Sequence, residues 1–176
     1  MNLENKIIAS NCEYVVKRLS SVDESDVQAL CERCSDFSNL IEGRLPEKDA
    51  GHDILFGLPP DKELEDKFVF GVYTENNYLI AVIDLIKDYK NPGEWTMGLM
   101  MIDPNERGKG LGKILNDYVK TWVSESQGKL LRIGVVEENY RAYKFWREVG
   151  YEETNRVKAK YGNKEHVVIV MSVCLI

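Results

Sequence analysis

Residues that bind metals or form disulfides are scarce in this chain. Its 176 residues include two histidines and four cysteines. Cys31 and Cys34 have the spacing of a redox or zinc pair, but no second pair lies near them, and His52 and His166 stand alone. The two thiols also fall at helical spacing on one apolar face. We therefore expect them in the core, and we expect no metal site.

Long apolar runs and an excess of positive charge are also missing. No run approaches the length that spans a membrane, and the first residues, Met1 to Lys6, are too polar for a signal peptide. The net charge of −6 argues against nucleic acid or an anionic membrane as a partner. A cytoplasmic protein is the expectation, and a cationic acceptor such as an amine is favoured electrostatically.

No internal repeat, low-complexity tract or linker divides the chain, so one domain over residues 1–176 is expected. Apolar periodicity and turn residues predict an α/β fold, with a mixed, mostly antiparallel sheet of about seven strands and helices on both faces. Residues 97–136 should form a parallel β-α-β unit. The expected strands are 12–19, 67–74, 78–87, 95–102, 130–136, 151–161 and 167–175. The expected helices are 23 to about 37, 46 to about 56, 111–128 and 139–150.

A glycine-rich turn is the most informative motif. The run Arg107-Gly108-Lys109-Gly110-Leu111-Gly112 follows the apolar segment Met97–Ile102 and opens a helical pattern. Successive backbone N–H groups in such a turn can close around a phosphate at the positive end of a helix. No Gly-Lys-Ser/Thr follows at P-loop spacing, and the turn comes too late for a dinucleotide fold. A different phosphate-bearing ligand is therefore expected.

The residues around this turn resemble the GCN5-related N-acetyltransferases, the GNAT family. Asp103-Pro104, Arg107, Gly110 and Gly112 have the order of that family's acyl-CoA signature. A second stretch, Asn139-x-x-Ala142-x-x-Phe145-Trp146-x-x-x-Gly150-Tyr151, is similar to the family's next motif. The resemblance covers roughly residues 67–174. It implies a single-domain acyl-CoA N-acyltransferase fold with acetyl-CoA as co-substrate and no metal.

The resemblance also implies how the coenzyme is held. Backbone N–H groups of residues 107–113 would bind the pyrophosphate, with Lys109 and Lys113 either adding charge or forming a solvated helix end. The strand Met100-Met101-Ile102 would pair with the pantetheine arm, and a backbone N–H there, assigned to Met101, would act as oxyanion donor. Asn139 would contact the coenzyme while also capping a helix. The implied coenzyme-binding residues are Met100, Met101, Ile102, Arg107, Gly108, Lys109, Gly110, Leu111, Gly112, Lys113, Asn139 and Trp146.

The sequence departs from the family pattern at the position expected to donate a proton to the leaving group. Many members have a tyrosine, which protonates the departing thiolate, at the position of Trp146. An indole N–H cannot serve as a proton source near neutral pH. Tyr143, on a neighbouring part of the same helix, is the candidate acid, and Tyr140 points further round. Two alternatives stay open: water could protonate the departing coenzyme A thiolate, or the thiolate could leave without a proton donor.

The general base is equally open. The position at which some members have a glutamate is Gly134 here. Glu137, Glu138, Asp84 and Glu94 are the carboxylates that could act through water instead. Catalysis could also depend mainly on positioning and on the oxyanion contact.

The expected function is transfer of an acetyl group from acetyl-CoA to a primary amine of a small molecule or peptide, by direct attack on the thioester. The alternative is a non-catalytic acyl-CoA-binding sensor or scaffold, which Trp146 favours. The acceptor is expected between residues 38–66 and the 152–166 hairpin, where Trp95 and Tyr161 either wall the cleft or pack in the core. A homodimer stays open because the sequence does not reveal the oligomeric state.

Overall fold

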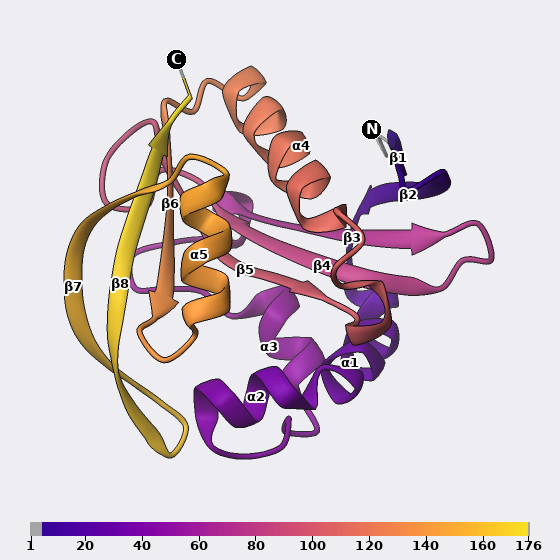
Figure 1. Cartoon of the computed structure of the whole chain (residues 1–176), viewed down its shortest axis with the longest axis horizontal. Helices are drawn as coiled ribbons and strands as arrows, with labels where there is room; N and C mark the ends of the chain where they lie inside the picture. Colours follow the sequence, from indigo (N-terminus) through magenta and orange to yellow (C-terminus); the bar gives the residue numbers. More distant parts are fainter. Residues whose placement is uncertain (1–4, 176) are drawn as a thin grey trace.

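Eight strands form one mixed sheet in a computed structural model, which describes residues 5–175 (Figure 1). Their order across the sheet is β1-β2-β3-β4-β5-β6-β8-β7, and β5 and β6 are the one parallel pair among them. The strands are β1 Asn5–Ala9, β2 Cys12–Arg18, β3 Lys67–Thr74, β4 Leu79–Ile86, β5 Glu94–Ile102, β6 Leu130–Val136, β7 Glu152–Tyr161 and β8 Lys164–Cys174. The α/β fold and the parallel β-α-β unit are thus confirmed. The edge strand β1 was not predicted.

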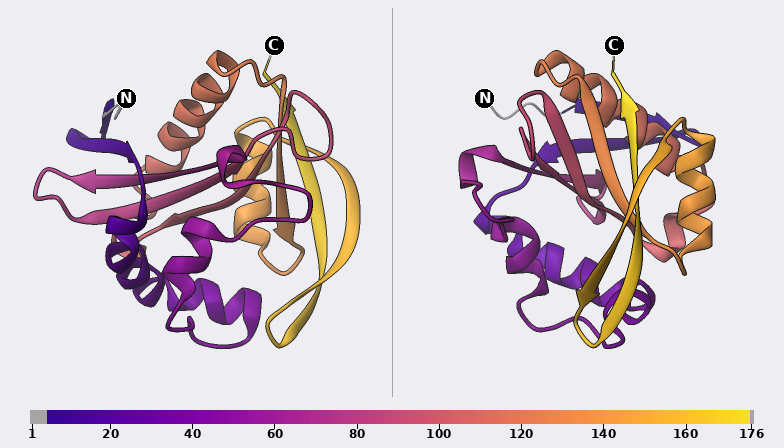
Figure 2. Two further views of the ribbon diagram at one scale, coloured as in Figure 1. Left: turned by 180° about the vertical axis from the view of Figure 1, so that it is seen from behind. Right: turned by 90° about the vertical axis from the view of Figure 1, so that its left-hand side faces the viewer.

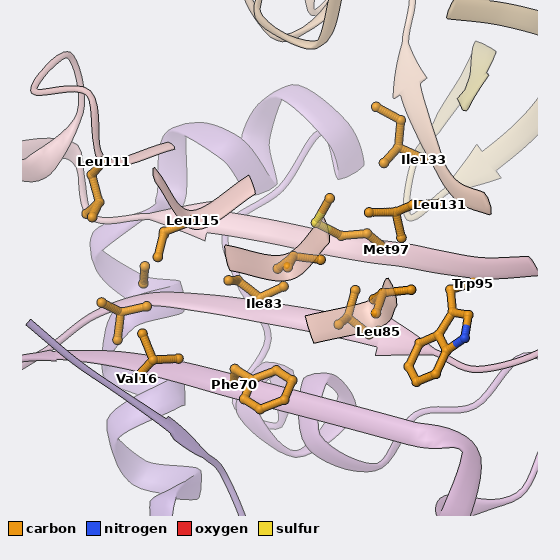
Figure 3. Close-up of a cluster of buried hydrophobic side chains, with 14 of the residues drawn as sticks. Val16, Phe70, Ile83, Leu85, Trp95, Met97, Leu111, Leu115, Leu131 and Ile133 are labelled. Atoms are coloured by element: carbon orange, nitrogen blue, oxygen red, sulfur yellow. The ribbon is translucent and has the colours of Figure 1, made fainter. Parts of the chain in front are cut away.

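Helices cover both faces of this sheet (Figures 1 and 2). The helices α4 (Leu111–Glu125) and α5 (Tyr140–Glu148) pack on one face over the larger core, whose central side chains are drawn in Figure 3. The other face is covered by α1 (Glu24–Arg33), α2 (Ser35–Glu42) and α3 (Ala50–Phe56), over a smaller core. Nearly every residue of β4 is buried, as expected of a strand covered on both sides. None of the helices within residues 5–175 has the length and apolarity needed to cross a membrane.

The amino-terminal third differs in detail from its prediction. The helix expected from residue 23 to about 37 breaks at Cys34, whose backbone leaves the helical region at φ −94° and ψ 29°. The third helix begins at Ala50 rather than at Pro46. Periodicity missed the break because the apolar spacing continues through it, and both Cys31 and Cys34 are buried as predicted. The break separates Arg33, at the end of α1, from Asp36, at the start of α2.

Two irregularities shape the middle of the sheet. The pairing of β4 with β5 shifts register between Asp84 and Leu85, and this leaves Gly98 as the extra residue of a bulge. The parallel pairing of β5 with β6 ends at Met97 opposite Ile133. Beyond that point the two strands diverge, and the β6-facing edge of residues 98–102 has no strand partner within residues 5–175. The glycine turn begins just after this unpaired edge.

Candidate active site

A cavity of about 940 Å³ opens where β5 and β6 diverge. Its walls come from β5 and β6, from the glycine turn, and from α2 and α5. Many of the predicted coenzyme-binding residues line it: Met100, Met101, Ile102, Arg107, Gly108, Gly110, Gly112, Lys113, Asn139 and Trp146. The fold therefore brings the two sequence motifs to one cleft. The volume lies at the upper end of the range for ligand pockets, about 300–1,000 Å³.

The glycines of the turn have two different structural roles. Gly108 and Gly110 have φ of 77° and 81°, in the left-handed region that favours glycine. No atom lies within 4 Å of the position of a β-carbon at either residue. Gly112, inside α4, would instead bring a β-carbon to 3.3 Å from Phe145 Cζ on α5. The first two glycines set the path of the turn, and the third allows α4 to approach α5.

The turn leads directly into the amino terminus of α4, with Gly110 as the N-cap residue. The first N–H groups of a helix have no carbonyl partner within the helix, and they carry the positive end of its dipole. Leu111 buries its side chain in the core, so only its backbone can face a ligand. Lys113 lines the cavity, whereas the exposed Lys109 ammonium lies 3.3 Å from Glu106 Oε2.

The second motif contributes an amide and an indole. Asn139 Oδ1 accepts a hydrogen bond from the backbone N–H of Ala142 at 3.2 Å, which confirms the predicted cap and leaves the side-chain NH₂ for a ligand. The Trp146 ring lies edge-on to Tyr151, with centroids 5.1 Å apart, and lines the cavity. Both side chains therefore border the cleft, Asn139 from the cap position of α5 and Trp146 from the helix itself.

Tyr143 lies differently from Trp146. It packs against the larger core and is not among the residues that line the cavity. Hydrogen bonding by Arg156, with a smaller contribution from Tyr143, lowers the pKa of Glu153, which places the Tyr143 hydroxyl towards that carboxylate. The role of Tyr143 as acid stays a prediction, and the position of the residue outside the cavity lining does not support it.

The four candidate bases are each paired with a cationic or ring nitrogen. Glu137 lies 2.5 Å from Arg156, and Glu94 lies 2.6 Å from Arg132. Glu138 Oε2 lies 3.0 Å from His166 Nδ1. Asp84 accepts a hydrogen bond from Lys67 Nζ at 2.8 Å. None of the four lines the large cavity, although Asp84 borders a second one.

Two ion pairs, which the sequence did not predict, fasten α1 to Asp103, just before the turn, and α2 to Arg107, at its start. Arg33 Nε donates to Asp103 Oδ2 at 2.6 Å, and the Asp103 side chain is 3% exposed. The Arg107 guanidinium donates to both carboxylate oxygens of Asp36, at 2.5 and 3.2 Å, and its Nε donates to Ile102 O at 2.8 Å. Hydrogen bonding by Arg107 lowers the pKa of Asp36. The Arg107 side chain thus braces the turn, and its backbone remains the part available to a phosphate.

Some of the residues from the two segments predicted to flank the acceptor lie at the large cavity. Phe37, Leu40 and Ile41 of α2 and Tyr161 of the hairpin line the same cavity as the turn. Trp95 does not, because it is 1% exposed and packs against Phe68 and Trp122 in the larger core. The hairpin is held on α2 by Lys164 and His166, whose side-chain nitrogens donate to Leu40 O and Ile41 O at 3.0 and 2.7 Å.

Comparison with known families agrees with this arrangement. The model of the "Acetyltransferase (GNAT) family" matches residues 35–151. The chain belongs to this family of acetyltransferases. No curated protein matches the chain. Within the described part of this GNAT protein, no group of three or more His, Cys, Asp or Glu residues is placed to hold a metal ion.

Solved structures show the same fold at low sequence identity. An acetyltransferase from Thermus thermophilus is 16% identical, with a TM-score of 0.73, over 97% of this chain and 99% of that one. The ribosomal-protein-S18-alanine N-acetyltransferase of Escherichia coli is 15% identical, with a TM-score of 0.70, over 92% and 94%. The spermidine/spermine N-acetyltransferase of Vibrio cholerae is 15% identical, with a TM-score of 0.66, over 92% of each chain. At these identities the likeness shows the fold alone.

Proposed function

We propose that this GNAT protein transfers the acetyl group of acetyl-CoA to a primary amine by direct attack of the amine on the thioester. The observation that carries the proposal is the unpaired edge of residues 98–102, which leads into a phosphate-type glycine turn within one cavity. This combination suits a long ligand with amide groups along one arm and a pyrophosphate at its end. The residues present therefore fit coenzyme A.

Each part of the cleft would supply a defined contact. Backbone N–H groups of residues 107–113 would hold the pyrophosphate, and the Asn139 amide would add a polar contact. The β5 edge would pair with the pantetheine amides, and the Met101 N–H would donate to the thioester oxygen as negative charge develops on it. Bound acetyl-CoA supplies an acyl group activated as a thioester, and positioning of the amine supplies much of the rate.

A covalent cysteine step does not fit the thiols. Cys31 and Cys34 are buried, and burial raises the pKa of both, that of Cys31 to about 11. Cys12 and Cys174 are exposed, and neither lines the cavity. A thiolate nucleophile is therefore not supplied to the cleft, which supports direct attack by the amine.

Two measurements on the purified protein test this proposal. Calorimetric titration with acetyl-CoA should show saturable binding at one site. Release of the coenzyme A thiol should then depend on both acetyl-CoA and an amine from a panel of small amines and short peptides. Tight binding with no thiol release for any amine would support the sensor alternative, which Trp146 at the usual tyrosine position favours. Absence of binding would overturn both.

A further inference from the structure

A second, smaller cavity of about 370 Å³ lies on the face of the sheet that carries α1, α2 and α3. It is bounded by the end of α3 and the segment that follows, by the loop residue Tyr89, and by β3, β4 and β5. Gly98, the bulge residue of β5, lines both this cavity and the larger one. Gly98 is therefore the residue that the two linings share, and it stands where β5 and β6 begin to diverge.

An ion pair is built into the wall of this second cavity. The Lys67 side chain is 3% exposed, and its ammonium donates to Asp84 Oδ1 at 2.8 Å. The other carboxylate oxygen, Asp84 Oδ2, faces Gly98, since a β-carbon there would lie 3.3 Å from it. Burial raises the pKa of Asp84, and Lys67 opposes that rise. Lys67 thus engages one oxygen, and the other faces Gly98, which lines both cavities.

The remaining polar groups suit a cationic ligand. Asp53 at the rim and Asp84 in the wall are two carboxylates beside the single ammonium of Lys67, which leaves an excess of negative charge. Thr96 lines the cavity, and its hydroxyl oxygen is buried with no hydrogen-bond partner among residues 5–175. Buried polar atoms without a partner are rare and call for an explanation such as a ligand. The apolar surface comes from Leu58, Pro59, Ile86 and Tyr89.

We propose that this second cavity binds the acceptor as a small primary amine without a carboxylate, and that Asp84 accepts its proton. This inference rests on the proposed acetyltransferase function and names the substrate class. The volume is at the low end for a ligand pocket, about 300–1,000 Å³, which favours a small molecule over a folded protein. The amine would reach the thioester at Gly98, from the side opposite the coenzyme.

The proton balance of the step is complete. The bound ammonium gives one proton to Asp84 Oδ2, and the neutral nitrogen forms a C–N bond to the thioester carbon. As the C–S bond breaks, the nitrogen gives a second proton through water to the departing sulfur. Asp84 then returns its proton to solvent. Amines of this kind have pKa values near roughly 10.4, so a proton acceptor is needed near neutral pH.

Two variants and a matched control test the proposal in the full chain, and a fourth variant, Tyr161→Ala, tests entry of the acceptor beside α2. Asp84→Asn keeps an oxygen for Lys67 and removes the base, so kcat should fall by about a hundredfold, within the range for general base catalysis, and recover as pH rises. Leu58→Trp narrows the rim and should raise the KM for the amine by about tenfold, equivalent to about 1.4 kcal/mol. Leu45→Trp is the matched control, since Leu45 is exposed and lies outside both cavities. The affinity for acetyl-CoA and the thermal midpoint should stay unchanged in Leu58→Trp and Leu45→Trp.

The amines are ethanolamine, putrescine, phenethylamine, glycine and a tetrapeptide with a free amino terminus. We expect turnover of the small amines that lack a carboxylate. Turnover of the tetrapeptide alone would overturn the inference, as would an Asp84→Asn enzyme within twofold of wild type. The inference would also be overturned if the KM for the amine were unchanged in Leu58→Trp and raised in Tyr161→Ala, because the acceptor would then enter beside α2. In each of these cases wild-type turnover leaves the proposed function standing, whereas acetyl-CoA binding without any turnover defeats that function itself.

Discussion

Replacing Gly110 by alanine separates a ligand-binding role of the turn from a purely conformational one. Gly110 has φ of 81°, and Gly93, in the turn before β5, has φ of 82°. Both positions have room for a β-carbon. A β-carbon at Gly110 would have no atom of a non-adjacent residue within 4 Å, and one at Gly93 would lie 3.5 Å from Lys129, an ordinary contact distance. Gly110 lines the large cavity and Gly93 lines neither cavity. Gly93→Ala is therefore the matched control for backbone strain.

The size of both effects follows from these geometries. An alanine in the left-handed region costs roughly 1–2 kcal/mol, so both variants should lose about the same stability. For a chain of this length each kcal/mol lowers the thermal midpoint by about 2–4 °C. If Gly110→Ala turns one backbone N–H away from the pyrophosphate, a charge-assisted hydrogen bond of about 1.5–3 kcal/mol is lost. The dissociation constant of acetyl-CoA should then rise by about tenfold to a hundredfold in this variant alone.

Calorimetric titration at 20 °C, roughly ambient and well below the melting range of typical domains, keeps all three proteins folded during the measurement. The expected result is a similar fall of the thermal midpoint in both variants and a loss of affinity only in Gly110→Ala. Equal affinity for acetyl-CoA in the two variants would refute the assignment of the turn as the pyrophosphate site. The glycine at position 110 would then serve only to start α4.

Three further predictions concern charge, proton transfer and thiols. Because Arg107 lowers the pKa of Asp36, their pair stabilises the protein above the ordinary pKa of aspartate, and that stability is lost as pH falls through the lowered pKa. Asp36→Asn should therefore lower the free energy of unfolding, measured in urea at pH 7, by up to about 1 kcal/mol, a small value because Asp36 is exposed. The difference from wild type should vanish in acid, and an equal difference at both pH values would contradict this reasoning. Tyr143→Phe should change kcat less than about twofold, because the residue does not line the cleft. A fall in kcat of about a hundredfold or more, the size typical of general acid catalysis, would instead support Tyr143 as the acid. A thiol reagent should label Cys12 and Cys174 in the native protein and all four cysteines in denaturant, and native labelling of Cys31 would disprove its burial.

The half of the chain after residue 67 could be predicted well because its signals are local. Alternation, turn residues and the cap at Asn139 each depend on neighbours in sequence, and the strands lie within a few residues of their predicted bounds. The two spaced motifs also marked residues that the fold brings to one cavity. Tyr143 was named as a candidate from helical periodicity, which gives a side chain's angle on its helix but not the residues that face it.

The rest of the site depends on contacts between distant segments. Arg33 meets Asp103 across 70 positions, and Asp36 meets Arg107 across 71. Lys67 and Asp84 lie on the two strands of a hairpin but are not directly opposite each other, since the residue opposite Asp84 is Val69. Nothing in one sequence marks which lysine reaches which aspartate. The second cavity was missed for the same reason, since its walls come from separate stretches of the chain.

The helix α2 is attached at both of its ends, and this has a geometric consequence. Asp36 near its start is bound to Arg107 of the glycine turn, and the carbonyls of Leu40 and Ile41 near its end are bound to the β7–β8 hairpin. Figure 1 shows α2 beside the tip of this hairpin. A helix of eight residues is about 12 Å long, and each inserted residue would rotate one end by about 100° relative to the other. An insertion within α2 would therefore break one attachment. The length of this helix must therefore match the distance between the turn and the hairpin, so its residue count is more constrained than its composition.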